Sequence, residues 1–337
     1  MLQKSINLQL RTNGLLNWFL LPRSNCLNDQ PGFVKDLISS SIFTAYDHLR
    51  PEDFNTVNFE HKLIQLDRSK YKSKFLSPVL EISDTLIDAC GEYISDFILH
   101  GSLSTLDFIQ GWSDFDSIVI IKDETLKDPV KMKRLRAVSL HVDRIIKKID
   151  NHQHHGIHFI AEKDLLMYPD LYLPHNLFKS GTSLMGKSKI LGKLRDSKKE
   201  QADRFNSIYA TFKNAYGGGT LQHHAIDGVY LMNNFRNHSN GMYQLKYFLS
   251  VIVILPSYFM NITGVNLSKS DSIVACREII SENNFEIIDR ATAIRNMWNT
   301  HPVVSNSIPD SVREILGKNY FFRGYNLIKE MKEHLGI

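Results

Sequence analysis

The stretch HGSLSTLDFIQGWSDFDSIVIIK, residues 100–122, decides how the first half of the chain folds. It follows a short apolar run, residues 94–99, which predicts a strand that ends just before the quoted stretch. Residues 102–110 can form one or two helical turns. Residues 114–121 begin polar and become a continuous β-branched run, which is typical of a strand buried on both faces.

The flanking sequence predicts further elements of the same domain. Apolar residues recur at helical spacing in 77–93, and residues 131–149 form a basic amphipathic helix. Residues 156–161 predict a third strand. Residues 180–186 form a turn region, and the basic stretch from there to residue 199 has loop character.

Three parts are expected along the chain. Residues 1–75 form an N-terminal extension that is mostly helical, although LRPEDFNTVNFEHK (49–62) has loop character. Residues 76–199 form an α+β (α/β) catalytic domain. Residues 200–337 contain several helices and form an all-α helical bundle.

Composition limits the class of protein. The chain has 337 residues, 43% of them hydrophobic and 23% charged, which are ordinary globular values. A formal net charge of +4 permits a local anion site but does not indicate a general nucleic-acid-coating protein.

Neither a disulfide framework nor a membrane span is expected. The three cysteines (Cys26, Cys90 and Cys276) form no CxxC pair, so they fit a reducing compartment. The most apolar run, Phe248–Leu255, has about half the length that a bilayer span requires. The N-terminus has no signal-peptide pattern. We therefore expect a soluble, cytoplasmic protein.

Two aspartates and a Gly-Ser pair carry the expected chemistry. Asp114 and Asp116 at i and i+2 of a strand point to one face, where both carboxylates can hold a divalent cation. About a dozen residues upstream, Gly101 lets the backbone approach a phosphate, and the Ser102 hydroxyl can donate to phosphate oxygens. This combination favours phosphoryl transfer assisted by Mg²⁺ or Mn²⁺.

Each of these motifs by itself is more often purely structural than functional. A lone Gly-Ser is usually a turn, and a lone Asp-x-Asp is usually a solvated strand end. The ordered set of strand, Gly-Ser, short helix and Asp-x-Asp leading into a buried strand is what favours a functional site.

The set resembles the polymerase-β-like nucleotidyltransferase superfamily. The signature of that superfamily stands here as Leu99–Ser102 and Asp114–Ile118, with Ser117 where an apolar residue is usual. Ser113, before the first aspartate, is similar to members that act on small molecules, and we count it among the nucleotide-binding candidates. The resemblance implies the fold and metal chemistry of the superfamily over roughly residues 75–195.

Two more segments resemble the small-molecule branch, which includes aminoglycoside nucleotidyltransferases. Gly181–Gly186 is similar to a turn at the end of its catalytic domain, and Asn261–Ile273 to a segment of its helical domain. A lysine of that helical domain can face the active-site cleft. The resemblance therefore makes Lys246 and Lys269 candidates for triphosphate contacts.

The third carboxylate of the superfamily is not evident. His158 stands where the resemblance implies Asp or Glu. Glu162 and Asp164 can replace that carboxylate if a bulge shifts the strand register. Alternatively, His158 is itself a base or ligand, because a neutral imidazole can accept a proton at physiological pH.

The expected reaction moves a nucleoside monophosphate, AMP from ATP in the first instance, to a hydroxyl of an unidentified acceptor and releases pyrophosphate. The partners are then a nucleoside triphosphate and an acceptor for which a small molecule is favoured. One alternative is a catalytically impaired regulator or antitoxin-like protein with the same fold. Another is an RNase that uses Arg295 and His301, whose spacing resembles small helical HEPN domains.

Overall fold

A computed structural model describes the chain in seven ranges: 2–21, 27–110, 112–149, 156–217, 241–298, 309–317 and 319–337. The chain forms two compact units, Met1–Asp196 and Ser197–Ile337. The first unit is mixed α/β and contains two small sheets. The described elements of the second unit are all helices. A mixed α/β region followed by a helical region is thus confirmed.

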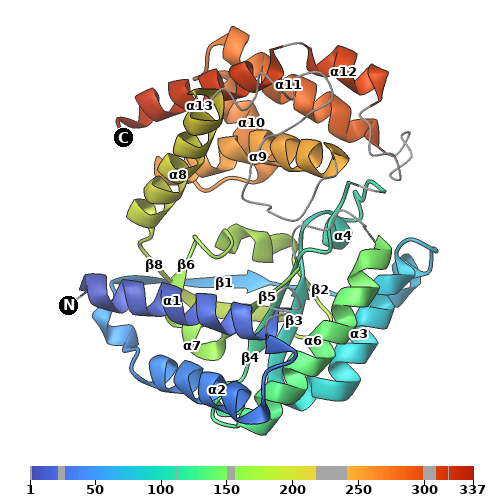
Figure 1. Ribbon diagram of the computed structural model, residues 1–337, viewed down its shortest axis with the longest axis vertical. Coiled ribbons are helices and arrows are strands. Elements are labelled where there is room, and N and C mark those ends of the chain that lie inside the picture. The colour runs from blue at the N-terminus through green and yellow to red at the C-terminus, as the bar shows by residue number, and fades with distance from the viewer. Residues whose placement is uncertain are drawn as a thin grey trace. The chain divides into compact units, whose positions relative to one another are not determined.

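The first unit alternates helices with short strands (Figure 1). Its α-helices are α1 (Leu2–Leu20), α2 (Gly32–Asp47), α3 (Ser77–Cys90), α4 (Gly101–Thr105), α5 (Asp123–Leu126), α6 (Pro129–Ile149) and α7 (Glu162–Leu165). Its strands are β1 (Thr56–Lys62), β2 (Ile64–Gln65), β3 (Ile94–Leu99), β4 (Ser117–Ile121), β5 (Ile157–Ala161), β6 (Tyr168–Pro169), β7 (Thr182–Ser183) and β8 (Lys189–Arg195). Short 3-10 helices are η2 (Pro51–Asp53), η3 (Arg68–Tyr71), η4 (Gly91–Tyr93) and η5 (His175–Ser180).

The larger sheet has the strand order β2-β7-β3-β4-β5. Strand β3 pairs antiparallel with β4, with Leu99 opposite Ser117, and β4 pairs parallel with β5. Every residue of β4 is buried, as its β-branched run predicts. The smaller sheet has the order β1-β8-β6.

Alternate residues of the central strands enter two different cores. Val119 and Phe159 pack in a cluster with α1, α2, α3 and α6, which gather on one side of the sheet (Figure 1). Ile118 and Ile160 face the other side, where residues of β6, β8 and η5 cover them. The period-two alternation of a strand explains this division.

Helix α1 closes the outer edge of β5. Asn13 donates to the carbonyl oxygen of Phe159 at 2.9 Å and Asn17 donates to it at 2.8 Å. The amide of Phe159 in turn donates to the side-chain oxygen of Asn17 at 2.8 Å. Two amide side chains thus replace the neighbouring strand that the edge lacks. Residues of the expected N-terminal extension therefore belong to the first unit.

Three expectations about local structure need correction. Residues 49–62, which have loop character in the sequence, contain β1, and the basic stretch before residue 199 contains β8. These two strands pair with each other from Thr56↔Arg195 to Lys62↔Lys189. The expected strand from Asp114 begins only at Ser117. Each polar strand is stabilised by a partner that is remote in sequence, which its own pattern does not reveal.

The second unit consists of α8 (Lys198–Gly217), α9 (Gly241–Ile262), α10 (Lys269–Arg277), α11 (Glu282–Asn296), α12 (Asp310–Leu316) and α13 (Tyr320–Leu335). Helix α10 starts where the sequence supplies a cap, because the Ser268 side chain accepts from the Asp271 amide at 3.1 Å. The apolar run Phe248–Leu255 lies inside α9. Among the described residues no helix combines the length and apolarity needed to cross a bilayer.

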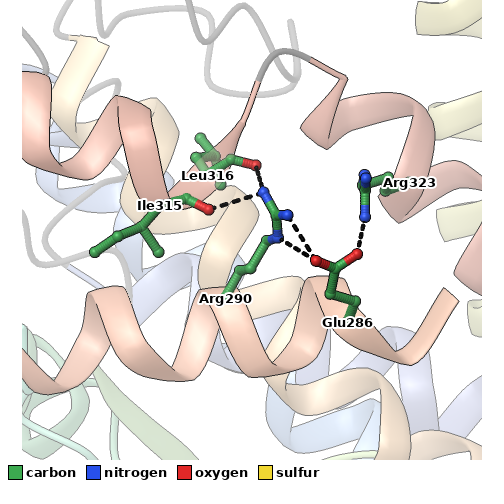
Figure 2. Close-up of polar contacts among 5 residues, drawn as sticks. All are labelled: Glu286, Arg290, Ile315, Leu316 and Arg323. Carbon is green, nitrogen blue, oxygen red and sulfur yellow. Dashed lines mark hydrogen bonds and ion pairs between the residues drawn. The ribbon is translucent and has the colours of Figure 1, made fainter. Parts of the chain in front are cut away.

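An ion network joins three helices of the second unit (Figure 2). Arg290 of α11 donates to the carbonyl oxygens of Ile315 and Leu316 at 3.1 and 3.2 Å, at the end of α12. Glu286, one turn earlier on α11, accepts from Arg290 at 2.6 Å and also from Arg323 of α13. These hydrogen bonds lower the pKa of Glu286. Arg290 therefore satisfies carbonyl groups that the end of α12 leaves without intrahelical partners.

Candidate functional site

Gly101 lies where β3 ends and α4 begins, with φ of +64°. A Cβ atom at this position would lie 2.9 Å from Oδ2 of Asp116. The two residues are brought together by the β3–β4 ladder, which continues as a 3.0 Å hydrogen bond from the His100 amide to the Asp116 carbonyl oxygen. Only glycine combines this backbone conformation with such a close carboxylate.

The two aspartates flank a core residue. Phe115 is fully buried, and its ring packs edge-on against Phe97 with centroids 6.2 Å apart. The alternation expected from the sequence would turn Asp114 and Asp116 away from that core. Asp114 is 8% exposed and Asp116 is half-buried. Both aspartates therefore precede β4 and lie just outside the strand, and their joint binding of a cation stays a prediction.

Ser113 has a structural hydrogen bond. Its hydroxyl oxygen accepts from the Ile109 amide at 2.9 Å, and its own amide donates to the Ile109 carbonyl oxygen at 2.8 Å. These bonds close the loop between α4 and the aspartates. Leu106 in the same loop has a φ of +64°, a rare conformation for a non-glycine residue. The predicted contact of Ser113 with a nucleotide stays a prediction.

Helix α4 is anchored by Tyr71, which the sequence did not single out, and by two residues of the expected turn region 180–186. The Tyr71 hydroxyl donates to the Leu103 carbonyl oxygen at 2.9 Å. The Ser104 hydroxyl lies 2.5 Å from the Ser180 carbonyl oxygen and 2.7 Å from the hydroxyl of Thr182. Ser102 is left half-exposed on this anchored helix. No spacing rule links these positions, because the contacts join segments far apart in the chain.

His158 lies on β5 directly opposite Ile118 of β4. The parallel register places it on the strand next to the aspartates, on the same face as Ile118. Its ring centroid is 5.6 Å from that of Tyr172. A role for His158 as base or ligand stays a prediction.

Glu162 and Asp164 do not lie with the aspartates. The β4–β5 register runs without a shift from Ser117↔Ile157 to Ile121↔Ala161, so both acids follow the opposite end of β5. The expected bulge is therefore absent from the β4–β5 pairing. Five residues of strand correspond to about 16 Å, which is too far for a shared cation.

Both acids instead have local hydrogen-bond partners. Glu162 accepts from the Asp123 amide at 3.1 Å. Asp164 is fully buried and accepts from the Tyr46 hydroxyl at 2.6 Å and the Ala161 amide at 3.0 Å. Burial raises the pKa of Asp164, against the lowering effect of these bonds. Their role is to hold α7 and α2 to the end of β5.

The donor set at Gly101 fits one kind of metal. Among the described residues no group of three or more His, Cys, Asp and Glu side chains could hold an ion. Mg²⁺ needs fewer protein ligands, because it is held by one or two carboxylates together with substrate phosphates. Asp114 and Asp116 supply the one or two carboxylates that such a site needs, and a Cβ atom at residue 101 would lie 2.9 Å from Oδ2 of Asp116.

The remaining candidates belong to the second unit or to undescribed residues. Lys246 in α9 is 1% exposed, and Lys269 is the first residue of α10 and is exposed. Their contacts with a triphosphate stay predictions. Arg295 is half-buried near the end of α11, whereas His301 lies outside the described residues.

Comparison with known proteins finds no relative of this chain. No family model, curated protein or solved structure matches the chain. A functional assignment therefore depends on the geometry around Gly101, Asp114 and Asp116.

Proposed function

We propose that this chain is a metal-dependent nucleotidyltransferase, which moves AMP from ATP to a hydroxyl of an acceptor and releases pyrophosphate. One observation carries the proposal: Oδ2 of Asp116 would lie 2.9 Å from a Cβ atom at Gly101. A backbone segment without a side chain, which a phosphate can approach, and a carboxylate able to hold its counter-cation thus lie side by side. Phosphoryl transfer requires these two elements together.

Each residue has a distinct part in this reaction. Gly101 lets the backbone approach the β- and γ-phosphates, and the half-exposed Ser102 hydroxyl donates to their oxygens. Asp114 and Asp116 would hold Mg²⁺ or Mn²⁺, which offsets the negative charge of the triphosphate when bound.

The acceptor oxygen forms a bond to the α-phosphorus, while the bond from that phosphorus to the departing pyrophosphate oxygen breaks. We assign the proton of the acceptor hydroxyl to the imidazole of His158, on the strand beside β4. A carboxylate would ordinarily occupy this position in proteins that the motif resembles.

A second candidate function is a regulator that binds nucleotide without turnover. It is favoured by the location of Glu162 and Asp164 at the far end of β5, which leaves His158 without a carboxylate alternative on that strand. The two candidates share the nucleotide site and differ in the transfer step.

The test is binding and turnover of the four α-labelled nucleoside triphosphates with Mg²⁺, using a cell extract as the source of acceptor. The variant Asp114→Asn/Asp116→Asn removes both charges, and Glu60→Gln/Glu81→Gln removes two carboxylates from exposed surface ion pairs as a control. Label transfer that the first variant loses and the control keeps supports the transferase. Metal-dependent binding without transfer supports the regulator, and absence of binding contradicts both.

A further inference from the structure

A lysine-rich segment lies against α4. Residues 67–74 read DRSKYKSK, and Lys70, Lys72 and Lys74 are exposed. Tyr71, between two of them, is 3% exposed and donates its hydroxyl hydrogen to the Leu103 carbonyl oxygen of α4 at 2.9 Å. The buried tyrosine fixes the segment beside the helix that carries Ser102.

A fourth lysine lies on another segment that contacts α4. Exposed Lys179 precedes Ser180, whose carbonyl oxygen accepts from Ser104 of α4 at 2.5 Å. Segments more than a hundred residues apart thus place lysines around the same short helix. The sequence shows three of these lysines together, and the tertiary fold adds Lys179 to them.

These four lysines keep their positive charge available. Within the parts of the chain that the structure describes, none of them forms an ion pair. Asp67, the acidic residue of the segment, accepts from the amide and hydroxyl of Ser69 at 3.1 and 2.6 Å. These bonds, and next Lys70 and Lys72, lower the pKa of Asp67, so its carboxylate offsets one of the four positive charges. Arg68 is held by Asp84 at 2.8 Å. The net +4 of the whole chain therefore conceals a local concentration of positive charge.

We propose that the lysines around α4 bind the backbone of a single-stranded nucleic acid, whose terminal hydroxyl is the acceptor of the transfer. The role of that hydroxyl depends on the transferase function proposed above. The excess of positive charge around α4 repels a polycationic acceptor such as an aminoglycoside and attracts a polyanion.

A nucleic acid suits this surface better than an acidic peptide. Phe75, directly after Lys74, is 43% exposed. An exposed aromatic ring among lysines can stack on a base, which is the usual combination in surfaces that bind single strands. The carboxylate side chains of an acidic peptide have no flat ring that could stack on Phe75.

The test compares two pairs of substitutions in the full-length chain. Lys70→Gln/Lys72→Gln removes two charges from the segment beside α4. Lys4→Gln/Lys127→Gln removes two charges from exposed lysines in α1 and directly after α5, towards the other end of the sheet. Binding of a labelled single-stranded RNA is measured by fluorescence anisotropy over a series of salt concentrations, with polyglutamate as competitor.

We expect the first pair to weaken RNA binding about tenfold at low salt and to reduce the salt slope by about 1.4, or about 0.7 for each lost phosphate contact. The control pair should leave the slope unchanged. Equal effects of the two pairs, or binding of polyglutamate in preference to RNA, would overturn the proposal.

Transfer is then tested on RNA with a free 3′-hydroxyl and on the same RNA ending in a 3′-phosphate. Label should join the free hydroxyl alone. If RNA binds through Lys70 and Lys72 but label joins neither RNA nor any other acceptor, the transferase function fails while the nucleic-acid surface stands. If label joins a small molecule and RNA does not bind, the transferase stands and this inference fails.

Discussion

At the scale of single residues, Gly101 combines a left-handed backbone conformation with a position beside the Asp116 carboxylate. Gly101→Ala should lose about 1–2 kcal/mol of stability from the left-handed conformation alone. A further loss should follow because the new Cβ would lie 2.9 Å from the Asp116 carboxylate. Urea denaturation measures the stability, and calorimetry measures the expected loss of Mg²⁺-ATP binding.

Gly336→Ala is the matched control. Gly336 has the same φ of +64° and no atom within 4 Å of a Cβ placed there. It therefore reports the backbone cost without a contact. Equal losses of stability in the two variants would show that the contact between the new Cβ atom and Asp116 does not destabilise the fold.

We expect His61 to make the stability of the first unit depend on pH. Burial lowers its pKa, assisted by His175, whose ring centroid is 5.4 Å away, and by Lys179. The unfolded chain therefore binds more protons than the folded chain near the ordinary value of 6.5. The contribution of His61 to the free energy of unfolding should be fully present above the ordinary pKa of 6.5 and should fall as the pH drops through it.

Urea denaturation between about pH 8 and about pH 5.5 tests this expectation, since the window spans the ordinary histidine pKa. His61→Gln should reduce the loss of stability on acidification. His48→Gln, at an exposed position of the same unit, should keep it. If the two variants lose stability equally, His61 is not the group responsible.

At the scale of elements, α1 acts as a substitute for a strand at the edge of β5. Asn17→Leu would leave the Phe159 amide without the acceptor that now lies 2.8 Å away. A buried polar group without a partner costs about 1–3 kcal/mol. Asn7→Leu is the same substitution at an exposed site of the same helix and should change stability by less than about 0.5 kcal/mol.

The measurement is the midpoint of urea denaturation, with the slope checked for constancy. Equal midpoints for the two variants would mean that α1 does not seal the edge. A lower slope for Asn17→Leu would indicate that α1 detaches before the rest of the unit unfolds.

At the scale of the whole molecule, the first unit should fold only with its N-terminal residues. Residues 1–196 contain β1, which pairs with β8, and α1, which covers β5. We expect this fragment to unfold cooperatively when it is produced alone. The fragment 76–199, which matches the catalytic domain expected from the sequence, lacks both partners.

Thermal unfolding followed by far-ultraviolet circular dichroism compares the two fragments. Fragment 1–196 should show a single sharp transition, whereas fragment 76–199 should show none. A cooperative transition of the shorter fragment would contradict the structural role assigned to residues 1–75.

Much of the local structure follows from the sequence by itself. The limits of β3, the burial of β4 and the helices α3 and α6 were predictable, because apolar periodicity reflects which side of an element faces the core. The Gly-Ser and Asp-x-Asp motifs also indicated the candidate site. Their spacing along one hairpin-like segment brings them together through the β3–β4 ladder.

The tertiary structure alone decided the rest. The β1–β8 pairing joins Thr56 to Arg195, and neither strand has an apolar pattern that requires it. The same holds for the Asn17 cap on β5 and for the placement of Lys179 and of the lysines in residues 70–74 around α4. The register of β5 also placed Glu162 away from the aspartates. Contacts between remote segments depend on how the elements pack, so the local sequence pattern of either segment does not predict them.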